Sequence, residues 1–95
     1  MAAFVIALID VTDIEAYKLY TAHTPRVIAQ YGGKFVVRGG APEALEGELA
    51  ASRFVVIEFA DRAAAKRFYD SKDYQEIVPL RQAASTGRMA VVDCV

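Results

Sequence analysis

The chain has 95 residues and a mass of 10.4 kDa, with 55% hydrophobic and 24% charged residues. This composition is sufficient for folding rather than disorder, and it predicts one globular domain over residues 1–95. A chain of this length buries only about 60 to 65% of the surface that it exposes when unfolded. Association with a second copy is therefore a natural way to complete its core.

Charge and hydropathy exclude several classes of partner. Eleven basic and twelve acidic residues give a net charge of −1 without a basic run, which argues against nucleic acid. The uncharged stretch at residues 1–9 is too short to cross a membrane, and no secretory signal flanks it. The lone Cys94 forms no internal disulfide, so we expect a cytoplasmic protein without a membrane partner.

The first third of the chain predicts a strand followed by a long helix. Residues 4–9, FVIALI, form an apolar run typical of a strand buried on both faces. Thr12 and Glu15 have capping-box spacing, so we expect the helix to begin near Thr12. Pro25 predicts a kink or restart.

The rest of the chain predicts three more strands and two helical segments. Gly39 and Gly40 indicate a bulge or turn, and the segment that follows, up to Ser52, is a candidate strand extension. Asp61 and Ser71 are the expected helix caps. The predicted elements are strand 34–38, strand 54–59, a helix ending near Asp70, a helical segment 72–84 interrupted at Pro79, and strand 89–95.

The resulting order, βαββαβ, is that of an α+β ferredoxin-like fold, in which two helices cover one face of a four-stranded antiparallel sheet. A sheet with one solvated face alternates apolar and polar residues, whereas residues 4–9 and 54–57 do not. Something other than the helices must cover the second face. A second copy of the same sheet is the simplest candidate, so we expect a homodimer.

Standard catalytic and cofactor motifs are missing from the sequence. One His and one Cys cannot build a zinc site, and no P-loop, GxGxxG, HExxH or GxSxG occurs. We therefore expect no metal and no cofactor. Haem is also unexpected, with His23 as the one histidine available to ligate it.

Two charged residues interrupt otherwise apolar strands. Arg38 follows FVV and Glu58 follows VVI, and an unpaired charge at such a position costs several kcal/mol. One interpretation is that they form a structural ion pair, with each other or across a dimer interface. The alternative is that they face a ligand.

Other polar residues have both a structural and a functional interpretation. Tyr69 and Tyr74 flank a helix break, where they either pack in the core or form the lip of a pocket. His23 is either a solvated helix residue or a general base. Arg81 either stabilises a helix end or holds a carboxylate.

Several motifs in order and spacing resemble one family. They are YGGKFVVRGG at 31–40, EG at 46–47, RFVVIEF at 53–59, and FYDSKDYQ at 68–75 followed by Arg81. Over almost the whole chain they resemble the bacterial family known as domain of unknown function 1330, in the dimeric α/β-barrel superfamily. The chain departs from the family pattern at Phe68, where Trp is frequent, and at Lys72, where Pro is frequent.

The resemblance implies a ferredoxin-like protomer whose sheet packs against that of its partner to form a dimeric barrel. Its recurring polar positions correspond here to Arg38, Glu58, Tyr69, Tyr74 and Arg81, which are candidate ligand-binding residues. Wider relatives include cofactor-free monooxygenases, lactone isomerases and haem- or chlorite-degrading enzymes, all with a cleft between sheet and helices. Analogy at the level of the fold assigns no activity.

Two hypotheses for function follow. In the first, the domain binds a small organic molecule, in particular an anion, in a cleft between sheet and helices. If it is an enzyme, His23, Glu58 or a tyrosine would transfer protons in an isomerase- or monooxygenase-like reaction. In the second, it is a non-catalytic dimeric structural or regulatory module. A cavity lined by Arg38, Glu58 or Tyr69 would favour the first hypothesis.

Overall fold

One antiparallel sheet and four short helices make up the computed structural model, which describes residues 1–95. The elements in chain order are β1 (Ala3–Val11), α1 (Ile14–Thr21), α2 (Thr24–Gln30), β2 (Lys34–Arg38), β3 (Arg53–Phe59), α3 (Arg62–Asp70), α4 (Lys72–Ala84) and β4 (Ser85–Asp93).

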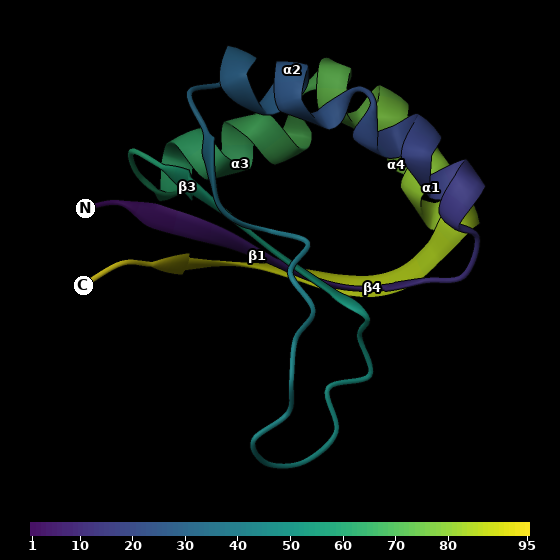
Figure 1. Ribbon diagram of the computed structural model, residues 1–95. Coiled ribbons are helices and arrows are strands. Elements are labelled where there is room, and N and C mark those ends of the chain that lie inside the picture. The colour runs from purple at the N-terminus through teal and green to yellow at the C-terminus, as the bar shows by residue number, and fades with distance from the viewer.

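The sheet has the strand order β2-β3-β1-β4, and every neighbouring pair is antiparallel. All four helices lie on one face of the sheet, and the two chain termini lie at the same end of the molecule (Figure 1). Each of the two helical connections is divided into two helices. This arrangement confirms the predicted α+β ferredoxin-like fold. None of the helices is long and apolar enough to cross a membrane.

The helix boundaries confirm some sequence expectations and correct others. Pro25 lies in the first turn of α2, so the helix restarts there as predicted. Asp13, and not Thr12, caps α1: its Oδ1 accepts a hydrogen bond from the Ala16 amide at 3.1 Å. The Thr12 amide instead bonds to the Ala84 carbonyl oxygen at 2.9 Å. The chain has not yet turned away from the sheet at this residue.

The connection formed by α3 and α4 also differs from expectation, at Pro79. Asp61 caps α3 and Ser71 caps α4, both as predicted. Pro79 was expected to interrupt the last helix, but α4 continues through it to Ala84. Proline removes one backbone hydrogen bond, and the burial of Ile77 and Val78, the two residues before Pro79, stabilises the helix against that loss.

Three strands have boundaries that differ from the sequence expectation. β1 begins one residue earlier, at Ala3, and β4 ends at Asp93 rather than residue 95. β1 also extends to Val11, and β4 begins at Ser85 rather than residue 89, because these two residues pair with each other. β3 begins at Arg53. Residues 39–52 form no strand, so the expected extension is wrong. They make a loop that projects on the side of the sheet opposite the helices (Figure 1).

The two faces of the sheet are both apolar but differ in burial. On the helix-facing side, Val5, Ala7, Ile9, Ile57 and Phe59 belong to the core. The other face carries half-buried apolar side chains on adjacent strands, namely Phe4, Ile6 and Leu8 of β1 with Phe54 and Val56 of β3. Within the protomer, no helix covers this second face.

Candidate ligand-binding site

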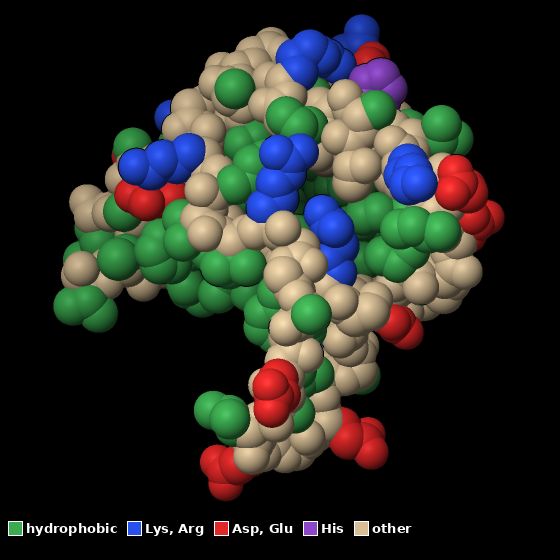
Figure 2. Space-filling view, viewed as in Figure 1, with side chains coloured by type: hydrophobic (Ala, Val, Ile, Leu, Met, Phe, Trp, Pro, Cys, Tyr) green, Lys and Arg blue, Asp and Glu red, His purple; other side chains and the backbone are tan.

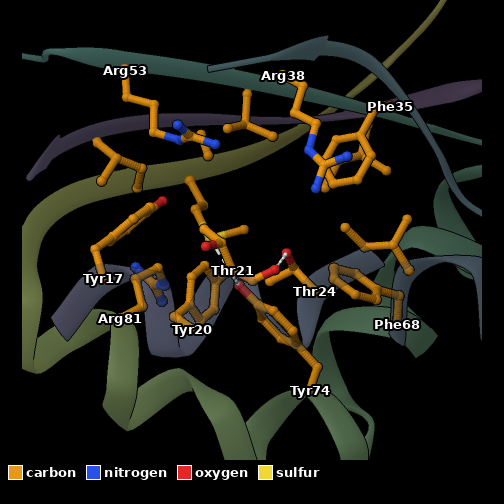
Figure 3. A pocket seen from close by; sticks show the side chains of 16 residues that line it. Tyr17, Tyr20, Thr21, Thr24, Phe35, Arg38, Arg53, Phe68, Tyr74 and Arg81 are labelled. Carbon is orange, nitrogen blue, oxygen red and sulfur yellow. Dashed lines mark hydrogen bonds between the residues drawn. The ribbon is translucent and has the colours of Figure 1, made fainter. Parts of the chain in front are cut away.

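A cavity lies between the helix-facing side of the sheet and α1, α2 and α4. Its enclosed volume is about 40 Å³, and eleven of its sixteen lining residues are hydrophobic. The other five are Thr21, Thr24, Arg38, Arg53 and Arg81, and three of the hydrophobic residues, Tyr17, Tyr20 and Tyr74, also carry hydroxyl groups (Figure 3).

Three arginines contribute to this lining and none has an acidic partner. Arg38 ends β2, Arg53 begins β3 and Arg81 lies on α4. The side chains of Arg38 and Arg53 point from the sheet towards the tyrosines on the helical side (Figure 3). No salt bridge includes any of the three, and no aspartate or glutamate lines the cavity. The site therefore carries an uncompensated positive charge.

Burial makes the charge of Arg81 costly for the folded protein, whereas Arg53 is half-buried and Arg38 is exposed. Arg81 is only 8% exposed, and the Nε atoms of Arg81 and Arg53 are buried without a hydrogen-bond partner. A buried donor without a partner costs about 1 to 3 kcal/mol, and more when it belongs to a charged group. Basic side chains also flank a hollow on the surface view (Figure 2).

Local structure positions the two arginines of the sheet. The Arg38 guanidinium lies over the Phe35 ring, with Cζ 4.5 Å from the ring centroid. The Arg53 guanidinium lies 5.5 Å from the centroid of Tyr17. It also lies against Gly39, where a Cβ atom would come within 2.6 Å of the Arg53 Cζ. Gly39 has φ +77°, so both its conformation and this close approach favour glycine.

Buried tyrosines supply neutral hydroxyl groups on the helical side. The Tyr20 and Tyr74 hydroxyls form a 2.7 Å hydrogen bond, and the Tyr74 ring packs 4.4 Å from that of Phe68. Burial raises the pKa of Tyr17, Tyr20 and Tyr74 above the usual 10.0. These hydroxyls therefore stay protonated at neutral pH and cannot offset the positive charge of the arginines.

The structure brings three of the predicted site residues together. Arg38, Tyr74 and Arg81 all line the cavity. Tyr69 does not line it; it lies in a separate groove beside α3 and β4. His23 is exposed at the start of α2 and lines neither space.

Glu58 lies on the opposite face of the sheet from the cavity. It pairs in register with Phe4 and Lys34, and its Oε1 is 3.9 Å from the Lys34 Nζ. The suggested ion pair between Arg38 and Glu58 is therefore wrong. The cause is a β-bulge between Phe35 and Val37, which turns Arg38 to the helix-facing side. The sequence had indicated a bulge at the later glycines.

Sequence reasoning missed Arg53 as a site residue. It stands two and four positions before Val55 and Ile57, so strand alternation places it on their face of the sheet, and both line the cavity. Tyr17 and Tyr20 pack in the core and also line the cavity. No group of three or more His, Cys, Asp or Glu side chains lies together.

Comparison with known proteins places the chain in a family. Residues 2–95 match the family described as Domain of unknown function (DUF1330). The chain belongs to this family. Phe68, one of the two positions at which the sequence analysis noted a departure, lines the cavity. No curated protein matches the sequence significantly.

Solved structures with the same fold have low sequence identity to this DUF1330 chain. A protein of unknown function from Rhodopseudomonas palustris has a TM-score of 0.82 and 22% identity, covering 99% of this chain and 82% of its own. SnoaB from Streptomyces nogalater, a cofactor-independent oxygenase, has a TM-score of 0.73 and 16% identity, with 99% and 93% covered. A dimeric ferredoxin-like protein of unknown function from Jannaschia sp. CCS1 has a TM-score of 0.73 and 8% identity, with 99% and 100% covered.

Proposed function

We propose that the protein binds a small organic anion in the cavity between its sheet and helices. The observation that carries this proposal is the convergence of Arg38, Arg53 and Arg81 on one apolar space that contains no carboxylate. Buried charges in proteins are ordinarily paired. A bound anion would supply the partner that the chain itself lacks.

The chemistry of the lining favours an aryl carboxylate among organic anions. A guanidinium presents a planar fork of donors that matches the two oxygens of a carboxylate. The cavity walls include Phe35 and Phe68, whose rings suit stacking with an aromatic body. The protonated Tyr17 hydroxyl offers a further donor to a ligand oxygen.

The same lining favours binding over catalysis. No histidine or carboxylate lines the cavity, and tyrosines with a raised pKa are poor proton acceptors at neutral pH. SnoaB is a cofactor-independent oxygenase, and its likeness to this chain is one of fold. The purely structural module is disfavoured because the space between sheet and helices is not fully packed.

We also propose that the protein is a homodimer that packs through the uncovered face of the sheet. The apolar side chains of β1 and β3 on that face support this assembly, and the Jannaschia protein of the same fold is dimeric. Burial of such a face against a second copy is the usual solution for a chain of this size.

Thermal denaturation with added ligand tests the binding proposal. Benzoate should raise the melting temperature, and the rise should grow with the logarithm of its concentration above the dissociation constant, because a ligand that binds only the folded state stabilises it. Benzamide, which has a similar shape and no charge, should have no effect. Arg81→Met should abolish the response, while the control Arg67→Met, at an exposed residue of α3, should preserve it. Equal responses to benzoate and benzamide would reject an anion site.

A further inference from the structure

A second, larger space lies beside the cavity, at the free edge of β4. It is a groove of about 520 Å³ between β4 and the helices α3 and α4. Its lining includes Ala65 and Tyr69 of α3, Gln82 of α4 and Val91 of β4. The groove is more open than the cavity and is lined by both apolar and polar residues.

Arg81 and Met89 are the two side chains that line both spaces. Met89 pairs with Ala7 on the helix-facing side of β4, the edge strand, so it stands between the interior cavity and the groove. Its Sδ atom lies 3.7 Å from the Tyr74 hydroxyl. Arg81 is buried with its Nε unpartnered, which places an unpaired hydrogen-bond donor at the same boundary.

The sizes of the two spaces show why their boundary matters. The enclosed cavity of about 40 Å³ is several times the roughly 10 to 15 Å³ that one enclosed water molecule needs. Sites for organic ligands occupy roughly 300 to 1,000 Å³. The cavity therefore accommodates the anionic group with at most one ring beside the arginines, but not an extended body. The groove on the other side of Met89 is large enough for the part of an organic ligand that does not fit the cavity.

We infer that Met89 is a movable gate between the two spaces and that the ligand is an extended aryl carboxylate. Its carboxylate lies beside Arg81, and its second ring passes Met89 into the groove next to Tyr69. Methionine suits this role because its unbranched, flexible side chain adapts its shape to a neighbour. This inference rests on the proposed function and adds the length of the ligand and its path.

Calorimetric titration with benzoate and with 4-phenylbenzoate tests the gate. Met89→Ala removes the obstruction, so it should strengthen 4-phenylbenzoate binding about tenfold through burial of the second ring. Benzoate binding should change less than about twofold, because its single ring is too short to extend past Met89 into the groove. Met89→Leu keeps a similar volume but replaces the flexible, unbranched chain by a branched one, so it should weaken 4-phenylbenzoate binding and leave benzoate binding unchanged.

A second pair of variants tests the groove without changing the cavity. Gln82→Trp places a large ring in the groove from an exposed position that does not line the cavity. It should weaken 4-phenylbenzoate binding about tenfold and leave benzoate binding unchanged. Ala83→Trp, at the adjacent exposed residue that lines neither space, is the matched control and should affect neither acid.

The outcomes separate this inference from the proposed function. If benzoate binds but neither Met89→Ala nor Gln82→Trp alters 4-phenylbenzoate binding, the gate is wrong and the anion site stands. If Ala83→Trp weakened 4-phenylbenzoate binding as much as Gln82→Trp does, the inference that Met89 is a gate would also be wrong. Failure of the parent protein and of Met89→Ala to bind either acid would overturn both.

Discussion

Arg81 combines near-complete burial with the absence of any acidic partner. Desolvation of this charge destabilises the folded protein, and the hydrophobic residues around it do not compensate for the lost hydration. Residues held at such a cost are concentrated in functional sites. An anion bound beside Arg81 would offset this unfavourable desolvation free energy, and the offset would contribute to the affinity of binding.

Replacing this charge should therefore stabilise the ligand-free protein. Arg81→Met keeps most of the side-chain length and removes the buried charge, so the free energy of unfolding should rise by about 1 kcal/mol or more. For a chain of this length, that is an increase of about 4 to 8 °C in the melting temperature. Calorimetry without ligand measures it. A lower melting temperature than that of the parent would show that Arg81 already has a stabilising partner.

The buried tyrosines predict an alkaline limit to stability. Burial raises the pKa of Tyr17, Tyr20 and Tyr74 in the folded state, whereas the unfolded value is 10.0. Above pH 10 the unfolded chain loses these protons first, so each group lowers the free energy of unfolding by about 1.4 kcal/mol per pH unit until its own folded pKa is reached.

Urea denaturation between pH 8 and pH 12 measures this loss. Below pH 10 the contribution of these groups is constant, and above it the free energy of unfolding should fall. The slope above pH 10 should be less steep in Tyr20→Phe, because one of the three groups no longer titrates. Stability that is independent of pH across this range would contradict the assignment of these hydroxyls as buried and protonated.

At the scale of elements, the apolar runs and the caps at Asp61 and Ser71 were sufficient to predict the order of strands and helices. Pro79 was misleading because the sequence does not show that packing of Ile77 and Val78 outweighs one lost hydrogen bond. Thr12 was misleading because the strand pairing of Val11 with Ser85 delays the start of the helix. Both corrections depend on tertiary contacts that local patterns do not contain.

Gly33, between α2 and β2, should be intolerant of a side chain. A Cβ atom there would lie 2.7 Å from the Phe59 ring and 2.9 Å from Ile28 Cγ2. Phe59 and Ile28 are buried, so Gly33→Ala should cost about 1 to 3 kcal/mol through overpacking. Gly40→Ala, where no atom lies within 4 Å of the added Cβ, is the control and should be near neutral. Denaturant melts compare them, and equal stability of the two variants would contradict the described packing.

The candidate site was only partly predictable for a similar reason. Arg38, Tyr74 and Arg81 were identified as candidates, and the cavity brings them together. The side of the sheet on which Arg38 lies depends on the bulge between Phe35 and Val37, since one extra residue reverses the direction of every side chain that follows. Glu58 was grouped with Arg38 because the sequence alone does not locate this bulge.

At the scale of the whole molecule, the uncovered face of the sheet predicts self-association. Light scattering should give twice the 10.4 kDa chain mass at micromolar concentration. Val56→Lys places a charge in the middle of the apolar face and should shift the protein to a monomer. Leu19→Lys, at an exposed residue of α1 on the helical side, should remain dimeric. A parent protein that is monomeric at this concentration would contradict the proposed assembly.

The charged cavity is the central claim, and NMR spectroscopy of the arginine Nε–H groups tests it most directly. Titration with benzoate should shift the Arg81 and Arg53 signals saturably and with one dissociation constant, because these buried Nε atoms have no partner in the empty protein. Benzamide should leave them in place. If the signals of exposed arginines such as Arg26 and Arg67 shift while those of Arg81 and Arg53 do not, the cavity is not an anion site.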